Sequence, residues 1–193
     1  MTFAAPRRVF LKISMAGLLV PGSTFAQTEL RSALQSGGHV IYFRHGATTW
    51  SGIDQIDWPR ERQRLLSDLG VQQSEQIGEA FRSAGIPVGE VLASPFARCR
   101  DMAEIAFGRV EERMELIGLL SDSEGRPARI RYLRDKLVSQ PTAGSNRIIV
   151  SHRSNIAEVA GVSLAEGEAV ITRPAAQRFE TRAQWMPEDW AQT

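Results

Sequence analysis

The chain has 193 residues, of which 42% are hydrophobic and 23% charged, and these proportions are typical of one globular domain. The formal net charge is +1, and removal of the first 26 residues would take away three basic residues and no acidic one, leaving −2. No polybasic segment then remains to favour nucleic acid or an anionic membrane surface as a partner. Cys99 is the only cysteine, which excludes an intrachain disulfide, and with three histidines it makes too small a ligand set to predict a metal site.

The N-terminal segment has the pattern of an export signal. A basic cluster with an Arg-Arg pair precedes an apolar run at 13–20, and small residues lead up to an expected cleavage after Ala26. The run is too short to span a membrane. The string Arg-Arg-x-Phe-Leu-Lys resembles the bacterial twin-arginine signal, although Pro6 leaves the general export route open. We expect residues 1–26 to be an export signal and residues 27–193 to be the folded domain of a periplasmic protein.

Apolar periodicity and turn residues predict alternating helices and strands along the mature chain. The predicted helices are 28–36, 67–84, 95–107, 127–138 and 155–159, and the predicted strands are 39–44, 88–93, 147–150, 168–172 and 178–185. Ser67 and Ser94 are the expected N-caps, with Pro95 at a first helical position. Arg129 is expected on an outer, basic helix face, and a turn is expected near Pro174. This alternation predicts an α/β three-layer sandwich, with helices on both faces of a mostly parallel sheet and an antiparallel edge strand.

Three of the predicted strands end in residues that suit an anionic ligand. The first ends in Arg44-His45-Gly46, the second leads into the helix that carries Arg98, and the third ends just before His152. Parallel strands present their carboxyl ends along one edge of a sheet, which is where open α/β sheets bind ligands. Arginine side chains, histidines and a helix N-terminus at one edge predict a site for a dianion, most simply phosphate.

Four motifs in series resemble those of a known family. They are Arg44-His45-Gly46-x-Thr48-x-Trp50, Leu66-Ser67-x-x-Gly70, Ser94-Pro95-x-x-Arg98 and Val150-Ser151-His152. In this order and spacing they resemble the motifs of the histidine phosphatase superfamily, which includes phosphoglycerate mutases, phosphohistidine phosphatases and bacterial heptose-phosphate phosphatases. The resemblance implies a phosphoric monoester hydrolase that needs neither metal nor cofactor and acts on a small phosphorylated substrate.

The resemblance also implies a role for each matching residue. His45 would attack phosphorus and become a phosphohistidine, while Arg44, Arg98 and His152 would hold the phosphoryl oxygens. His45 must then be neutral at its attacking nitrogen, whereas His152 would help most when protonated. The positions expected to bind the substrate are Gly46, Thr48, Ser94 and Arg153.

The chain departs from the family pattern at two positions, and its general acid is not set by a matching motif. Ser51 stands where the family often has Asn, and Arg153 stands where Gly commonly follows the second histidine, so Arg153 would add a phosphate contact or narrow the pocket. Many members carry the acid as Glu in a Leu-x-Glu string. The nearest string here is Leu120-Ser121-Asp122, so Asp122 is the expected acid and Glu124 its alternative.

Other functions stay open or are excluded by particular residues. A cysteine phosphatase built on Cys99 is excluded because its loop needs Arg six positions later, where this chain has Ile105. Arg100 competes with Arg98 for the site, since positions two apart on a helix do not share a face. A non-catalytic phosphate-binding protein and a phosphohistidine-protein phosphatase remain as alternatives. A mutase is less favoured in so short a chain, and the oligomeric state and physiological substrate stay open.

Overall fold

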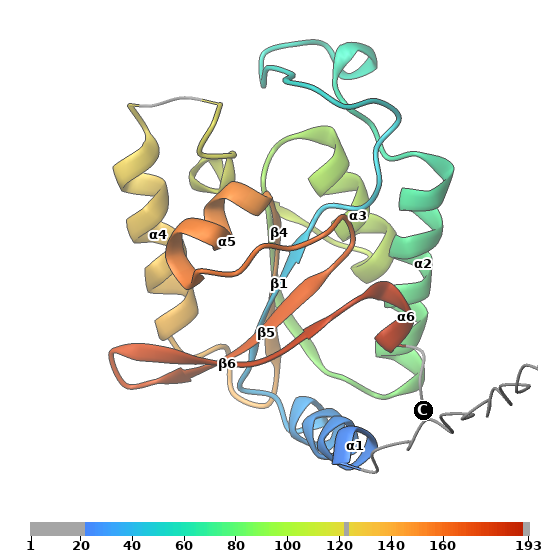
Figure 1. The fold of residues 1–193 in the computed structure, drawn as a ribbon, viewed down its shortest axis with the longest axis vertical. Coiled ribbons are helices and arrows are strands. Elements are labelled where there is room, and N and C mark those ends of the chain that lie inside the picture. Colours follow the sequence, from blue (N-terminus) through green and yellow to red (C-terminus); the bar gives the residue numbers. More distant parts are fainter. Residues whose placement is uncertain (1–21, 122–123, 191–193) are drawn as a thin grey trace, which may run out of the picture.

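The computed structural model describes residues 22–121 and 124–190, which are built around one six-stranded sheet (Figure 1). The strands are β1 (Val40–Arg44), β2 (Val88–Ala93), β3 (Glu111–Glu112), β4 (Asn146–Ser151), β5 (Ala169–Ala175) and β6 (Arg178–Trp185). They lie in the order β3-β2-β4-β1-β5-β6, and neighbours among the first four are parallel. β5 is antiparallel to β1 and β6 is antiparallel to β5. The predicted α/β fold, mostly parallel with an antiparallel edge, is confirmed.

Helices cover both faces of this sheet (Figure 1). The helices are α1 (Gly22–Gln35), α2 (Asp68–Ser83), α3 (Ala97–Phe107), α4 (Arg126–Val138), α5 (Arg153–Ala160) and α6 (Pro187–Trp190), with 3₁₀ turns at Arg60–Arg62 and Met114–Leu116. Apolar residues of α1, α2, α3 and α6 form the core on one face, where Ile41 and Phe43 of β1 point. Those of α4 and α5 form the core on the other face with Val40 and Tyr42. Because β1 is buried on both faces, its sequence is a continuous apolar run rather than an alternating one.

The register of the parallel strands sets which residues meet at the carboxyl edge. Arg44 of β1 lies opposite Ser151 of β4, so the next residues, His45 and His152, leave the sheet side by side. The backbone N–H of His45 donates to the carbonyl oxygen of Ser151 at 3.0 Å, which extends this pairing by one residue. The pairing of β2 with β4 brings Ser94 to the same edge.

The predicted start of α3 is wrong. The helix begins at Ala97, with Phe96 at the N-cap position, rather than at Pro95 with Ser94 as the cap. The Ser94 hydroxyl lies 2.9 Å from Nε2 of His152 instead. Ser94, which the sequence pattern predicts to be a helix cap, therefore contacts His152 at the edge of the sheet.

Smaller differences concern helix ends and one arginine. α1 begins at Gly22 rather than at residue 28, and α5 begins at Arg153 rather than at residue 155. Arg129 is buried, not on the outer face, and its Nη1 lies 3.4 Å from the carbonyl oxygen of Gly118. Pro174 lies within β5, and the turn into β6 follows at Ala176, which has φ +55°. Strand β3 and helix α6 were not predicted.

Residues 1–21 of the expected export signal lie outside the described residues. Within 22–121 and 124–190, none of the helices combines the length and the apolar character that crossing a bilayer requires.

Two glycines allow α2 to pack against the loop that follows His45. A Cβ on Gly70 would collide with the carbonyl oxygen of Ala47, and one on Gly46 would lie 3.0 Å from the carbonyl oxygen of Gly70. Ser67 caps α2 by accepting the N–H of Gly70, and its own N–H donates to the carbonyl of Ala47. The first turn of α2 therefore holds the loop at the carboxyl end of β1.

Substitution Gly70→Ala should destabilise the protein by about 1–3 kcal/mol, because the new methyl group meets backbone that has little room to move. Urea unfolding of both proteins measures the difference. Glu75→Ala, on the exposed side of the same helix, is the control and should change stability by no more than about 0.5 kcal/mol. Equal stability of Gly70→Ala and the parent would contradict the close packing described here.

Candidate active site

The strand ends surround one pocket of about 320 Å³ at the carboxyl edge of the sheet. Its charged and imidazole lining residues are Arg44, His45, Asp54, Arg64, Arg98, His152 and Arg153. The rings of His45 and His152 lie edge to face, with their centroids 5.6 Å apart. Residues from the ends of β1 and β4, from helices α3 and α5 and from three loops thus line one cavity.

His45 is held as a neutral imidazole with one nitrogen available. Its Nδ1 lies 2.9 Å from the carbonyl oxygen of Gly46, which can only accept, so Nδ1 carries the proton and Nε2 has a lone pair. The side chain is buried, and this burial, together with the charge of Arg98, lowers the pKa of His45 well below its usual range. A neutral imidazole with an available Nε2 is a competent nucleophile.

His152 is also neutral, in the opposite tautomer. Its Nδ1 lies 3.4 Å from Nη2 of Arg98, which can only donate, so Nδ1 accepts and Nε2–H donates to the Ser94 hydroxyl. Burial, followed by the charge of Arg98, lowers the pKa of His152 well below its usual range. The sequence favoured a protonated His152, whereas burial and the neighbouring positive charge keep the ring neutral. A bound anion in the pocket would raise the pKa of His152 and favour its protonated form.

Arg98 faces the pocket and Arg100 does not. Nη1 of Arg98 donates to Oδ2 of Asp54 at 2.7 Å, and both side chains are at most 5% exposed. The guanidinium also lies over the ring of Phe96, with Cζ 4.5 Å from the ring centroid. Arg100 instead pairs with Glu112 on the surface. Asp54, which was not singled out in the sequence, therefore orients the arginine of the third motif.

Arg44 is fixed by the loop that precedes β5. Its Nη1 donates to the carbonyl oxygen of Leu164 and its Nη2 to Oε1 of Glu166, both at 3.0 Å. These contacts use one side of the guanidinium, and Arg44 still lines the pocket.

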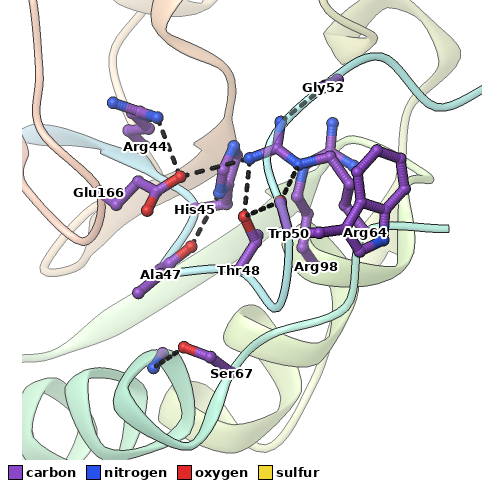
Figure 2. Close-up of polar contacts among 12 residues, drawn as sticks. Arg44, His45, Ala47, Thr48, Trp50, Gly52, Arg64, Ser67, Arg98 and Glu166 are labelled. Atoms are coloured by element: carbon purple, nitrogen blue, oxygen red, sulfur yellow. Dashed lines mark hydrogen bonds and ion pairs between the residues drawn. The ribbon is translucent and has the colours of Figure 1, made fainter.

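Arg64 is a pocket residue that the sequence analysis missed. Its Nη2 donates to the Thr48 hydroxyl at 2.7 Å, and its Nε donates to the carbonyl oxygen of Trp50 at 3.0 Å (Figure 2). Thr48, predicted to bind substrate, is not among the residues that line the pocket, and its hydroxyl contacts the pocket residue Arg64 instead. The only sequence signal for Arg64 is its place two residues before the Leu66-Ser67 motif, on a loop whose path the sequence does not specify.

The remaining predicted residues lie in different places. Gly46 packs against α2, and Arg153 is an exposed residue at the start of α5 that lines the pocket. Asp122 lies outside the described residues, and Glu124 is exposed. Burial raises the pKa of the Cys99 thiol to about 12, so it is a poor nucleophile at neutral pH.

The charges around the pocket favour an anion. Four arginines line it, and the two carboxylates beside them, Asp54 and Glu166, are both engaged in ion pairs with those arginines. With both histidines neutral, the site keeps a surplus of positive charge. It can therefore bind a tetrahedral dianion beside the free nitrogen of His45.

Stability should fall as the pH drops below about 6.5. The pKa values of His39, His45 and His152 are all lowered, so the unfolded chain takes up protons near its ordinary histidine pKa while the folded protein does not. His45 and His152, whose pKa values lie well below the usual range, then each add a loss of up to about 1.4 kcal/mol per pH unit below 6.5. Urea unfolding between pH 7.5 and 5.0 measures this slope, and His152→Gln should reduce it. A stability that stays constant over this range would refute the neutral assignment.

Comparison with known proteins agrees with this site. Residues 40–124 match the sequence profile of the Histidine phosphatase superfamily (branch 1), whereas none of the curated proteins matches the chain. The fold is shared with the protein histidine phosphatase SixA, solved with tungstate, at a TM-score of 0.57, with 16% identity over 78% of this chain and 98% of that one.

Two other phosphatases have the same fold. The α-ribazole phosphatase of Shigella flexneri has a TM-score of 0.55, with 15% identity over 75% of this chain and 95% of that one. A phosphoserine phosphatase mutant of Entamoeba histolytica, in complex with phosphoserine, has a TM-score of 0.54, with 12% identity over 78% of this chain and 98% of that one. Residues 40–124 are thus similar to the histidine phosphatase superfamily, and the chain shares its fold with solved phosphatases.

Proposed function

We propose that the protein is a metal-independent phosphomonoester hydrolase that works through a phosphohistidine on His45. The observation that carries this proposal is the hydrogen bond from Nδ1 of His45 to the Gly46 carbonyl, which leaves Nε2 as the free nitrogen in a pocket lined by arginines. Phosphoryl transfer depends mainly on positioning and charge stabilisation, and arginines can supply the positive charge that metal ions supply elsewhere.

The reaction has two transfers. In the first, Nε2 of His45 forms a bond to phosphorus as the bond from phosphorus to the leaving oxygen breaks, and that oxygen takes a proton. In the second, water attacks phosphorus and gives a proton to the carboxylate that protonated the leaving oxygen, the P–N bond breaks to restore neutral His45, and inorganic phosphate leaves. Arg44 and Arg98 hold the phosphoryl oxygens through both transfers, and His152 binds them beside His45 through Nδ1 once the bound anion favours its protonation.

The proton for the leaving oxygen is assigned to Asp122, with Glu124 as the alternative. A general acid typically contributes about 10²–10⁴-fold. Asp122→Asn should therefore slow hydrolysis of an alkyl phosphate far more than that of p-nitrophenyl phosphate, whose phenolate leaves without a proton.

His45→Ala should abolish the release of p-nitrophenol from p-nitrophenyl phosphate in the presence of excess chelator, because the attacking nitrogen is gone. Rapid acid quench of the parent enzyme should trap a phosphohistidine. Arg100→Ala is the matched control on α3, since that side chain pairs with Glu112 outside the pocket, and it should keep near-parental activity. Activity that requires added metal, or that survives His45→Ala, would disprove the mechanism. Phosphate binding without turnover or a trapped intermediate would indicate a binding protein instead.

A second candidate is a phosphohistidine-protein phosphatase. Asp54, the carboxylate that lines the described part of the pocket, is already committed to Arg98 by a 2.7 Å ion pair. A leaving imidazole takes up a proton near neutral pH without a strong acid, since its ordinary pKa is about 6.5. SixA, which shares the fold, is a protein histidine phosphatase. Faster release of phosphate from a phosphohistidine peptide than from alkyl phosphates would favour this candidate.

We further propose that the protein is exported to the periplasm. The support is the basic, apolar and small-residue order of residues 1–26. Expression of the full chain in a bacterium with both export routes should give a periplasmic protein that begins at Gln27, as measured by fractionation and mass spectrometry. Replacing both Arg7 and Arg8 by Lys should retain the protein in the cytoplasm if the twin-arginine route is used. A full-length cytoplasmic protein from the parent sequence would contradict export.

A further inference from the structure

The segment from Leu164 to Glu168, called here the backing loop, is hydrogen-bonded to the dipeptide Arg44-His45. The N–H of Gly167 donates to the carbonyl oxygen of His45, and the N–H of Arg44 donates to the carbonyl oxygen of Glu168, both at 3.0 Å. Leu164 accepts from the Arg44 guanidinium through its carbonyl oxygen. The backing loop lies outside residues 40–124, the part of the chain that matches the family profile.

One carboxylate oxygen of the backing loop joins two pocket arginines. Oε1 of Glu166 lies 3.0 Å from Nη2 of Arg44 and 3.4 Å from Nη2 of Arg64 (Figure 2). The side chains of both arginines are less than 20% exposed, and that of Glu166 is 29% exposed. Guanidinium groups that share so small a space repel each other, and the shared carboxylate offsets this repulsion.

Arg64 links Glu166 to the loop at residues 48–52. Besides Glu166, its guanidinium binds the Thr48 hydroxyl and the carbonyl oxygens of Trp50 and Gly52. Glu166 is also held through its backbone, because its carbonyl oxygen lies 3.4 Å from Nε2 of Gln73. A chain of contacts therefore runs from the backing loop, through Glu166 and Arg64, to the 48–52 loop.

We propose that Glu166 is a positioning residue that holds Arg44 and Arg64 in the arrangement that binds the phosphoryl group. This inference rests on the proposed function, since it names the residue that prepares the same site. Glu166 touches the arginines rather than the reacting atoms. Its contribution is to fix two long, mutually repelling side chains before substrate arrives, so that binding does not have to order them.

The direction in which one substitution changes the affinity for phosphate distinguishes a positioning role from a purely electrostatic one. Glu166→Gln removes a negative charge beside an anion site while keeping the size and shape of the side chain. If the charge alone mattered, the more positive pocket would bind phosphate more tightly. If Glu166 positions the arginines, phosphate will bind more weakly in spite of the added positive charge.

The test measures the Kd of inorganic phosphate by calorimetry, together with kcat and KM for p-nitrophenyl phosphate. For Glu166→Gln we expect phosphate binding to weaken by about tenfold and kcat/KM to fall by at least as much. The change in Tm should be small, because the amide oxygen of Gln can still accept hydrogen bonds from both guanidinium groups. Glu166→Asp keeps the charge on a shorter side chain and should lie between Gln and the parent. In an Arg64→Gln background, the effect of Glu166→Gln on phosphate binding should shrink.

Glu168→Gln is the matched control. Glu168 belongs to the same backing loop, and its carboxylate accepts the N–H of Ala165 without touching either arginine. Its substitution should leave the Kd for phosphate near the parental value. Tighter or unchanged phosphate binding by Glu166→Gln, or an equal loss in Glu168→Gln, would overturn the proposal. Because phosphate binding is measured without turnover, an inactive parent that still binds phosphate would reject the proposed reaction and leave this result interpretable.

Discussion

The site depends on the parallel pairing of β1 with β4 in one particular register. Both strands are buried on both faces, and Arg44 lies opposite Ser151, so the two histidines that follow leave the sheet together. A shift of one residue would exchange the faces of every side chain and separate the two imidazoles. About one hundred residues of sequence lie between these histidines, and the strand pairing is what brings their rings to a centroid distance of 5.6 Å.

A second constraint is electrostatic. Concentrating four arginines around one pocket costs free energy unless carboxylates or a bound anion compensate. Asp54 and Glu166 provide part of this compensation, each on a loop rather than on the sheet. Burial, together with the remaining positive charge, lowers the pKa values of His45 and His152 and keeps both neutral, and the same charge makes the pocket suit a dianion. The site is thus arranged before substrate binds, which is the condition for strong electrostatic stabilisation of a transferring group.

The match to the family covers the first two of the three strand ends and stops before His152. The fold supplies the rest, because β4 returns between β1 and β2 and carries His152 to the pocket. Solved phosphatases with only 12–16% identity share this fold. Much of the sequence can therefore change while the fold is kept. The backing loop belongs to the part of this chain that lies beyond the family match.

The sequence by itself determined the alternating α/β order, the buried strands and the residues at their carboxyl ends, because these depend on local apolar periodicity and on turn residues. Only the tertiary structure decided which side chains line the pocket or contact the residues that do. Ser94 reads as a helix cap but contacts His152, and Arg129 reads as a surface residue but is buried. Arg64, Asp54 and Glu166 lie on loops without periodicity, and their partners are 10 to 122 residues away in the chain. Such pairings follow from the packed positions of the loops, which no local pattern of residues specifies.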